Sequence, residues 1–344
     1  MLQERIEHRW IAAFRRTLEL CGVGPGDEVA VLAETQSRPI LPDLAELALH
    51  AIGARPFRVT MPSPAVSTTI PLRSTGTSLA MGGHQAAIAG LAAAKLVVDC
   101  TAEGLLHAPE RAAIMARGAR IMMISNEHPE VLERLQPDPA IGEAVRAAVA
   151  RARAAKVMRV TSPAGTELTV RLPGAPVRAA MGFTSADAPV AYWPAGLVAI
   201  FPVAGSVEGQ VVLAPGDANL TFKEYCRERT TLTIERDRVT AIAGDGMEAA
   251  MLRRQLEDWE EPEAWCVSHV GWGLNPKARW DGLMAYDKAQ VNGTELRAFA
   301  GNFLFSTGSN EHAGRFCRGH FDFPMRGCTV ELDGVAVVKD GRPA

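Results

Sequence analysis

Short, mainly apolar runs alternate with helix-like segments over the first 150 residues of the chain. The apolar runs have the length of buried strands, and the segments between them have the leucine and alanine spacing of covering helices. The strands are expected at 28–32, 56–60, 96–100 and 120–124, and the helices at 41–52, 84–94 and 109–117. Alternation at this pitch predicts a mostly parallel sheet with right-handed crossovers, and therefore an α/β amino-terminal domain.

The pattern changes after a strong helix-forming segment at 142–151, which we interpret as a bridge between two domains. Strand and turn patterns then follow at 158–161, 167–171, 197–203, 210–213 and 231–242, with one clear helix at 247–259. The chain is therefore predicted to contain an α/β domain over residues 1–155 and a β-rich α+β domain over residues 156–344.

Composition places the chain among ordinary globular proteins with a large core, because 47% of its 344 residues are hydrophobic. A formal net charge of −3 gives no overall basic field, so no nucleic-acid partner is expected. The segment 1–9 is charged and lacks an apolar signal core, and no run of about 18 apolar residues occurs elsewhere. We therefore expect a cytoplasmic protein with no membrane partner.

Six cysteines are scattered through the chain, a pattern that predicts free thiols and no disulfide framework. Cys266 and Cys317 each precede a histidine by three residues, which raises the alternative of a structural zinc site. Side chains three apart on a strand face opposite sides, so a zinc site with this spacing requires a turn in the backbone.

Candidate chemistry is concentrated in the segments SHVGW at 268–272 and GHFDFP at 319–324. Side chains two apart on a strand share a face, so His320 and Asp322 can converge on one metal, and His269 then adds a second imidazole. Two imidazoles, one carboxylate and open coordination positions are typical of non-haem Fe(II) oxygenases. The same ligand atoms also suit zinc, manganese or cobalt, so spacing leaves the metal open. The carboxy-terminal domain is predicted to be the metal-binding one.

Three motifs in this part of the chain carry a family resemblance. They read VSHVGWGL at 267–274, GNFLFSTG at 301–308 and HFDFP at 320–324, and further agreement lies at 105–110, 193–196 and 222–229. With these motifs the chain resembles the 2,5-dihydroxypyridine 5,6-dioxygenase family, which is distantly related to metallo-aminopeptidases of the thermophilic type. The resemblance spans nearly the whole chain.

The resemblance implies a ring-cleaving dioxygenase that uses O2 and a small heteroaromatic substrate and assembles as a homo-oligomer. It implies that His269, His320 and Asp322 bind Fe(II), which agrees with the ligand set argued from strand geometry. It further implies that His107 is an acid/base group, and that Arg297 and Ser306 hold the substituents of the ring.

Two positions depart from the family pattern. Ala180 and Tyr192 stand where the family has a glutamate and a histidine in its substrate pocket. The substrate is expected to be 2,5-dihydroxypyridine or a close analogue, and these two departures favour a different hydroxylated ring. We predict that Tyr192 and Trp193 line the pocket wall and offer an aromatic face in place of an imidazole.

The main alternative is a metallohydrolase of the aminopeptidase or amidohydrolase type that uses zinc, cobalt or manganese. The related aminopeptidases use a glutamate in a comparable glycine turn as a metal ligand, and Glu208 lies in such a turn. A second metal site at Glu208 would make two-metal hydrolysis possible. We favour a turn residue that pairs with Arg227 or Arg229.

Overall fold

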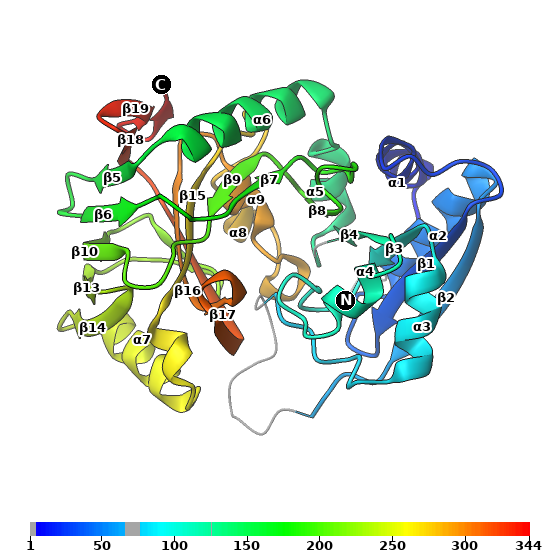
Figure 1. The fold of residues 1–344 in the computed structure, drawn as a ribbon, viewed down its shortest axis with the longest axis horizontal. Helices are drawn as coiled ribbons and strands as arrows, with labels where there is room; N and C mark the ends of the chain where they lie inside the picture. Colours follow the sequence, from blue (N-terminus) through cyan, green and yellow to red (C-terminus); the bar gives the residue numbers. More distant parts are fainter. Residues whose placement is uncertain (1–4, 66–75, 125) are drawn as a thin grey trace.

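A computed structural model describes residues 5–65, 76–124 and 126–344 of the protein. Two halves lie side by side in Figure 1. The half at the right contains a parallel sheet, and the half at the left contains antiparallel sheets.

The sheet of the first half has five strands in the order β2–β1–β3–β4–β8, and all neighbouring strands are parallel. Its strands are β1 (Glu28–Glu34), β2 (Arg55–Met61), β3 (Leu96–Asp99), β4 (Arg120–Ile124) and β8 (Val190–Trp193). The parallel sheet predicted from the strand-helix alternation is therefore confirmed. Because all five strands run in one direction, their carboxyl ends meet at one edge, where open α/β sheets bind ligands.

Helices cover both faces of this sheet. Val29 and Val31 of β1 pack with α1 and α2, whereas Ala30 and Leu32 pack with α3 and α4, as alternation along a strand requires. The helices are α1 (His8–Leu20), α2 (Ile40–Ile52), α3 (Gln85–Ala93) and α4 (Arg111–Met115), and α5 (Pro129–Arg134) lies beside α1. Helix α1 is an addition to the predicted elements.

The second half contains an eight-stranded sheet, β14–β13–β10–β6–β5–β18–β19–β20, and a five-stranded sheet, β17–β16–β15–β9–β7. Both are antiparallel throughout, and the largest hydrophobic core draws residues from both. The strands of the larger sheet are β5 (Val157–Thr161), β6 (Glu167–Arg171), β10 (Val207–Leu213), β13 (Thr230–Glu235), β14 (Arg238–Ala243), β18 (Thr329–Leu332), β19 (Val335–Lys339) and β20 (Arg342–Pro343). Those of the smaller sheet are β7 (Val177–Ala180), β9 (Leu197–Ile200), β15 (Val267–Gly273), β16 (Phe303–Asn310) and β17 (Arg315–Met325).

Shorter elements complete this half. They are the pair β11 (Ala218–Asn219) and β12 (Glu224–Tyr225), the helices α7 (Met247–Asp258), α8 (Gly282–Ala285) and α9 (Thr294–Ala298), and the 3₁₀ turns η1 (Pro262–Trp265), η2 (Lys288–Gln290) and η3 (Glu311–Ala313). The extended run expected at 231–242 is a hairpin, β13 and β14. Arg236 and Asp237 both have positive φ, and this pair makes the tight two-residue turn between the strands.

The chain passes between the halves more than once. Helix α6 (Pro139–Ala154) buries Val145 and Val149 in the core of the second half, although it precedes that half in sequence. Strand β8 lies well beyond residue 155 but pairs with β4 in the parallel sheet. The division into domains at residue 155 stays a prediction, and the two halves are joined by these shared elements.

Within the described ranges, no helix has both the length and the apolar character needed to span a membrane. All six cysteines are free, as their scattered spacing predicted. The thiol of Cys317 contacts Glu261 Oε2 at 3.1 Å, and the thiol of Cys266 lies 3.9 Å from the carbonyl oxygen of Pro262. Neither cysteine joins its neighbouring histidine at a metal cluster among the described residues.

Candidate metal centre

Two strands of the smaller sheet, β15 and β17, supply the predicted metal ligands, and β16 lies between them. On β17, His320 and Asp322 share one face, whereas Phe321 and Phe323 of the same strand are buried in the hydrophobic core. Strand β16 lies between β17 and β15 and pairs Ser306 with Asp322. The order of the strands therefore brings His269 to two side chains that are fifty residues away in sequence.

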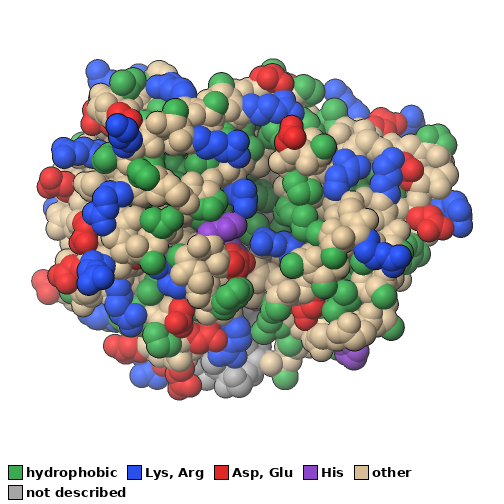
Figure 2. Space-filling model, in the orientation of Figure 1, with side chains coloured by type: hydrophobic (Ala, Val, Ile, Leu, Met, Phe, Trp, Pro, Cys, Tyr) green, Lys and Arg blue, Asp and Glu red, His purple; other side chains and the backbone are tan. Residues whose placement is uncertain are grey.

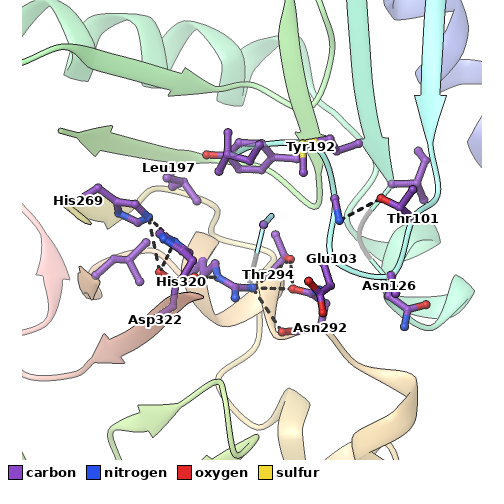
Figure 3. Close-up of a pocket in the computed structure, with 18 residues that line it drawn as sticks. Thr101, Glu103, Asn126, Tyr192, Leu197, His269, Asn292, Thr294, His320 and Asp322 are labelled. Carbon is purple, nitrogen blue, oxygen red and sulfur yellow. Dashed lines mark hydrogen bonds and ion pairs between the residues drawn. The ribbon is translucent and has the colours of Figure 1, made fainter. Parts of the chain in front are cut away.

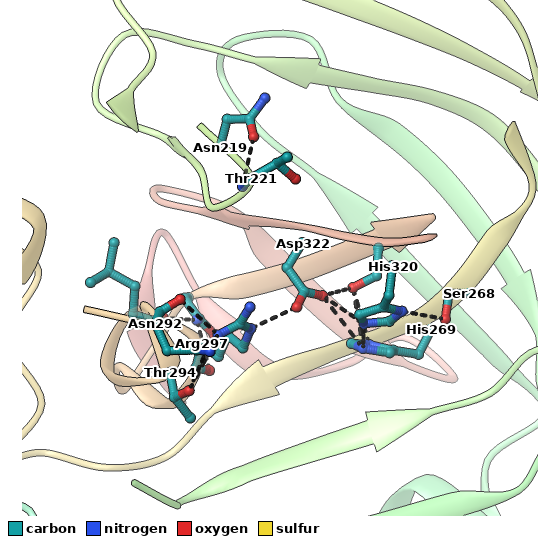
Figure 4. Close-up of polar contacts among 12 residues, drawn as sticks. Asn219, Thr221, Ser268, His269, Asn292, Thr294, Arg297, His320 and Asp322 are labelled. Carbon is teal, nitrogen blue, oxygen red and sulfur yellow. Dashed lines mark hydrogen bonds and ion pairs between the residues drawn. The ribbon is translucent and has the colours of Figure 1, made fainter. Parts of the chain in front are cut away.

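An irregularity in β15 sets the direction of the His269 side chain. Val267 pairs with Thr307 and Val270 pairs with Phe305. Between these two pairs, β15 therefore contains one more residue than β16. The extra residue is a β-bulge, which turns side chains that would otherwise alternate between faces. As a result, the consecutive residues Ser268 and His269 both reach the same cluster (Figure 4).

The three ligand atoms converge closely. His269 Nε2 lies 3.1 Å from His320 Nε2 and 3.5 Å from Asp322 Oδ1, and His320 Nε2 lies 3.2 Å from the same oxygen. Atoms bound at about 2.1 Å to one ion are roughly 3 Å apart, so these separations fit a shared cation. All three residues are at least 95% buried. A search of the described residues for three or more histidine, cysteine or acidic side chains with metal-binding geometry finds this group.

Hydrogen bonding fixes which atoms of His320 face the cluster. The hydroxyl of Ser268 donates to the carbonyl oxygen of Ser309, so its oxygen accepts from His320 Nδ1, 3.2 Å away. With its proton on Nδ1, His320 presents a lone pair at Nε2. That lone pair faces Asp322 Oδ1 and His269 Nε2. Acceptor atoms grouped in this way are stabilised by a cation between them.

Charges around the cluster favour a neutral imidazole and an ionised carboxylate. Burial lowers the pKa of His269 to about 3, against the opposing effect of Asp322. Burial alone would raise the pKa of Asp322, but Arg297 and then His320 more than offset it, and the pKa lies well below its ordinary value. These are the protonation states in which imidazole and carboxylate bind metals.

The donor set therefore fits a divalent cation held by His269 Nε2, His320 Nε2 and the Asp322 carboxylate. Ser306 donates to Asp322 Oδ1, and Arg297 Nε donates to Asp322 Oδ2 at 2.6 Å (Figure 4). Arg297 is in turn held by Asn292, whose Oδ1 accepts from Arg297 Nη1 at 2.8 Å. The resemblance assigned Arg297 and Ser306 to the substrate. In the structure both contact the Asp322 carboxylate, and Arg297 also lines the adjoining pocket.

A pocket with an open volume of about 650 Å³ adjoins the cluster. Figure 3 shows His269, His320 and Asp322 on one side and Thr101, Glu103 and Asn126 on the other. Tyr192 and Leu197 line the wall between these groups. The second group follows β3 and β4, so the pocket lies between the carboxyl edge of the parallel sheet and the β15–β17 strands. This is the ligand-binding edge of an open α/β sheet.

His107 is placed by the loop that follows β3. The buried carboxylate of Asp99 accepts hydrogen bonds from the backbone of Thr101 at 3.0 Å and of Leu105 at 2.8 Å, which shapes this loop. His107 Nδ1 lies 2.9 Å from Glu311 Oε1, and its ring centroid is 4.8 Å from that of His320. His107 Nε2 is buried without a hydrogen-bond partner among the described residues. The structure thus brings His107 to the cluster with one nitrogen held and one available.

The structure does not bring Trp193 to the pocket. Neighbouring residues on a strand face opposite sides, so Tyr192 faces the pocket while Trp193 points into the core of the first half. Its indole packs against Phe14 and donates to the carbonyl oxygen of Leu135 at 2.7 Å. Glu208 lies on β10 of the eight-stranded sheet, outside the metal-binding group. Ala180 is fully buried, beside the partly buried Tyr192.

Several residues of the site carried no recognised signal in the sequence. Glu311 is 204 residues from its partner His107, and no local pattern connects them. Asn292 and Thr294, which contact Arg297, lie before and at the start of a five-residue helix. Thr101 and Glu103 had a usable signal, because polar residues just after a buried parallel strand lie at the ligand-binding edge.

Replacing Ser268 with alanine should weaken metal binding by about 10- to 100-fold, because the hydroxyl orients His320 and sets its protonated nitrogen. The measurement is a competitive titration of the metal against a chelator. The matched control is Thr307→Val on the adjacent strand β16. It removes a buried hydroxyl that has no hydrogen-bond partner in the described part of the chain. Equal affinity of Ser268→Ala and the control would contradict the orienting role.

The fold and the site point to a class of protein: two histidines and one carboxylate with the geometry of a metal centre lie beside a ligand pocket. Comparison with known proteins gives the family. The family model for NicX, described as 2,5-dihydroxypyridine 5,6-dioxygenase, matches residues 9–344. The chain therefore belongs to the NicX family, as its motifs predicted.

Two relatives illustrate this membership. The chain is 37% identical over 332 residues to a 2,5-dihydroxypyridine 5,6-dioxygenase of Pseudomonas putida, with 95% of this chain and 94% of the relative covered. The solved structure of 2,5-dihydroxypyridine dioxygenase from Pseudomonas putida KT2440 superposes with a TM-score of 0.90 at 36% identity, over 97% of this chain and 96% of that one.

A more distant structure shares the fold alone. Wild-type AmpT from Thermus thermophilus has a TM-score of 0.68 at 14% identity, over 98% of this chain and 99% of that one. The parallel sheet with its antiparallel partner sheets is therefore an architecture that this family shares with a protein of very different sequence.

Proposed function

We propose that the protein opens the ring of 2,5-dihydroxypyridine or a close analogue with O2, and that it depends on Fe(II). The observation that carries the proposal is the convergence of His269, His320 and Asp322 beside a pocket in a member of this dioxygenase family. A ferrous ion held there supplies a redox-active Lewis acid and a template for two reactants.

The side chains around the cluster have separate roles in this proposal. Arg297 and Ser306 hold the Asp322 carboxylate in one orientation through hydrogen bonds to its two oxygens. Tyr192 presents its ring along the pocket wall, where it can stack on a heteroaromatic substrate. Orientation of this kind lowers the barrier by placing the reacting groups before reaction.

His107 is the proposed acid/base group. Burial lowers the pKa of His107, with Glu311 opposing the shift, so the ring is neutral at pH 7. Its Nδ1 donates to Glu311, which leaves a lone pair at Nε2. That nitrogen can accept a proton from a ring hydroxyl and return it during ring opening.

Replacing His107 with asparagine should lower kcat by about 100-fold or more, because an amide cannot shuttle a proton. Glu311→Ala should cause a smaller loss by releasing His107, and Glu311→Gln should restore part of it, since its carbonyl still accepts from Nδ1. Steady-state kinetics measures these effects, with the exposed His84→Asn as the control. Unchanged kcat in His107→Asn would remove His107 from the mechanism.

The test of the proposal is oxygen uptake by protein purified without oxygen and loaded separately with Fe(II), Zn(II) or Mn(II). We expect the iron form to consume one O2 for each 2,5-dihydroxypyridine lost. An iron-loaded protein that consumes no O2 with any dihydroxypyridine would contradict it. Hydrolysis of an amide or peptide by the zinc form without O2 would instead favour the metallohydrolase alternative.

Two expectations belong with this proposal. We propose a cytoplasmic enzyme that assembles as a homo-oligomer, the oligomer on the basis of the family resemblance. Light scattering coupled to size-exclusion chromatography measures the mass directly. A mass of about 37 kDa would contradict the oligomer, because one chain has a mass of 36.8 kDa.

A further inference from the structure

A second cavity, here called the outer chamber, lies on the other side of Tyr192 and His269 from the pocket beside the metal cluster. Arg111, Arg153, Arg178 and His312 line it, and Tyr192 and His269 lie in the walls of both cavities. Its open volume is about 1310 Å³, including the mouth. Figure 2 shows a hollow between the two halves, with basic and histidine side chains around an apolar floor.

Elements from both halves build the outer chamber. Arg111 begins α4 of the first half, Arg153 lies in the last turn of α6, and Arg178 lies on β7. All three side chains have hydrogen-bond contacts. Arg111 Nη1 donates to the carbonyl oxygen of Leu106, Arg153 Nη2 donates to that of Val177 at 3.2 Å, and Arg178 Nη2 lies 3.4 Å from His312 Nε2. Three chain segments thus direct arginines to one cavity.

Positive charge is in excess in this chamber. Its two acidic side chains are Glu311, which is bound to His107, and Asp187, which is exposed. Burial, and then the positive charges of Arg111 and Arg153, lower the pKa of Arg178, as expected when like charges share a cavity. The apolar floor includes Phe201, whose ring lies 5.5 Å from that of His269 and 5.3 Å from that of His312.

We propose that the outer chamber binds the carboxylate group of a small organic acid whose remaining part lies toward Tyr192 and His269. Planar guanidinium groups match a carboxylate in shape and charge, and an anion relieves the repulsion among the three arginines. The apolar floor suits a flat organic group more than a hydrated inorganic anion.

The acid can have two sources, and both rest on the proposed function. The substrate itself can be a dihydroxypyridine that carries a carboxylate. Alternatively, the acid is the product. When both atoms of O2 enter the bond between a ring carbon bearing OH and a neighbouring CH carbon, the first becomes a carboxylic acid and the second a formyl group. The neutral ring thereby becomes an anion.

The test uses nicotinate and nicotinamide, which share one ring and differ in the charge of one substituent. Calorimetry on the iron-loaded protein without oxygen should show nicotinate binding at least about tenfold more tightly than nicotinamide. Arg178→Gln and Arg153→Gln should each weaken nicotinate about tenfold and leave nicotinamide unchanged. The control is Arg151→Gln, which removes an exposed charge from the same helix as Arg153.

Equal affinities for the two compounds, or equal behaviour of all three variants, would overturn the carboxylate site. This binding result is independent of turnover, so loss of the proposed dioxygenase activity leaves it intact.

Kinetics then separates the two sources. A carboxylated substrate predicts that Arg178→Gln lowers kcat/KM for dihydroxypyridine carboxylates alone. A carboxylate product predicts that these compounds are not turned over and that Arg178→Gln relieves inhibition by the product.

Discussion

Replacing His320 with alanine is expected to abolish ring cleavage, with a fall in kcat of at least about 1000-fold, because the cation loses a ligand and both reactants lose their template. His320 Nε2 lies within 3.2 Å of both other ligand atoms, so its removal opens one corner of the site. Metal content after anoxic loading should fall in parallel, as measured by elemental analysis.

Controls distinguish loss of the metal from loss of the fold. His320→Gln keeps a polar side chain of similar length at this buried position, and Thr307→Val changes a neighbouring strand without removing a ligand. Full activity in His320→Ala with a normal circular dichroism spectrum would contradict the assignment of the metal site.

Replacing Arg297 with methionine is expected to lower the free energy of unfolding of the metal-free protein by about 3–5 kcal/mol. Arg297 and Asp322 form a buried ion pair at 2.6 Å, and removal of the arginine leaves the carboxylate without its compensating charge. Urea unfolding of metal-free and metal-loaded protein measures the effect. The loss should be smaller with metal bound, since a cation at Asp322 provides part of the missing positive charge.

The double variant Arg297→Met with Asp322→Asn tests this reasoning. Removal of both charges should recover much of the stability lost in Arg297→Met, because no isolated charge remains buried. If the loss is the same with and without metal, Asp322 is not shared between Arg297 and a cation.

Local patterns in the sequence predicted the features that depend on neighbouring residues. The four apolar runs predicted strands β1 to β4 of the parallel sheet, because buried strands in such a sheet are nearly continuous in hydrophobic residues. The two-residue spacing of His320 and Asp322 placed both on one face of a strand, and the structure has them so. The family motifs connected His269 to that pair.

Features that depend on distant pairing had no local signal. The bulge at Ser268 and His269 exists only relative to β16, and the pairing of β8 with β4 brings a later segment back to the first sheet. Trp193 was expected at the pocket wall with Tyr192, although two adjacent strand residues face opposite sides. The alternation of side chains along a strand therefore predicts that only one of these two residues faces the pocket.

The central claim is that one ferrous ion is held by His269, His320 and Asp322. The most direct measurement is anomalous X-ray scattering from crystals grown without oxygen and loaded with Fe(II), recorded above and below the iron absorption edge. The account predicts a single iron peak bounded by the two Nε2 atoms and the Asp322 carboxylate. An iron peak elsewhere in the molecule, with these three side chains bound to no metal, would contradict it.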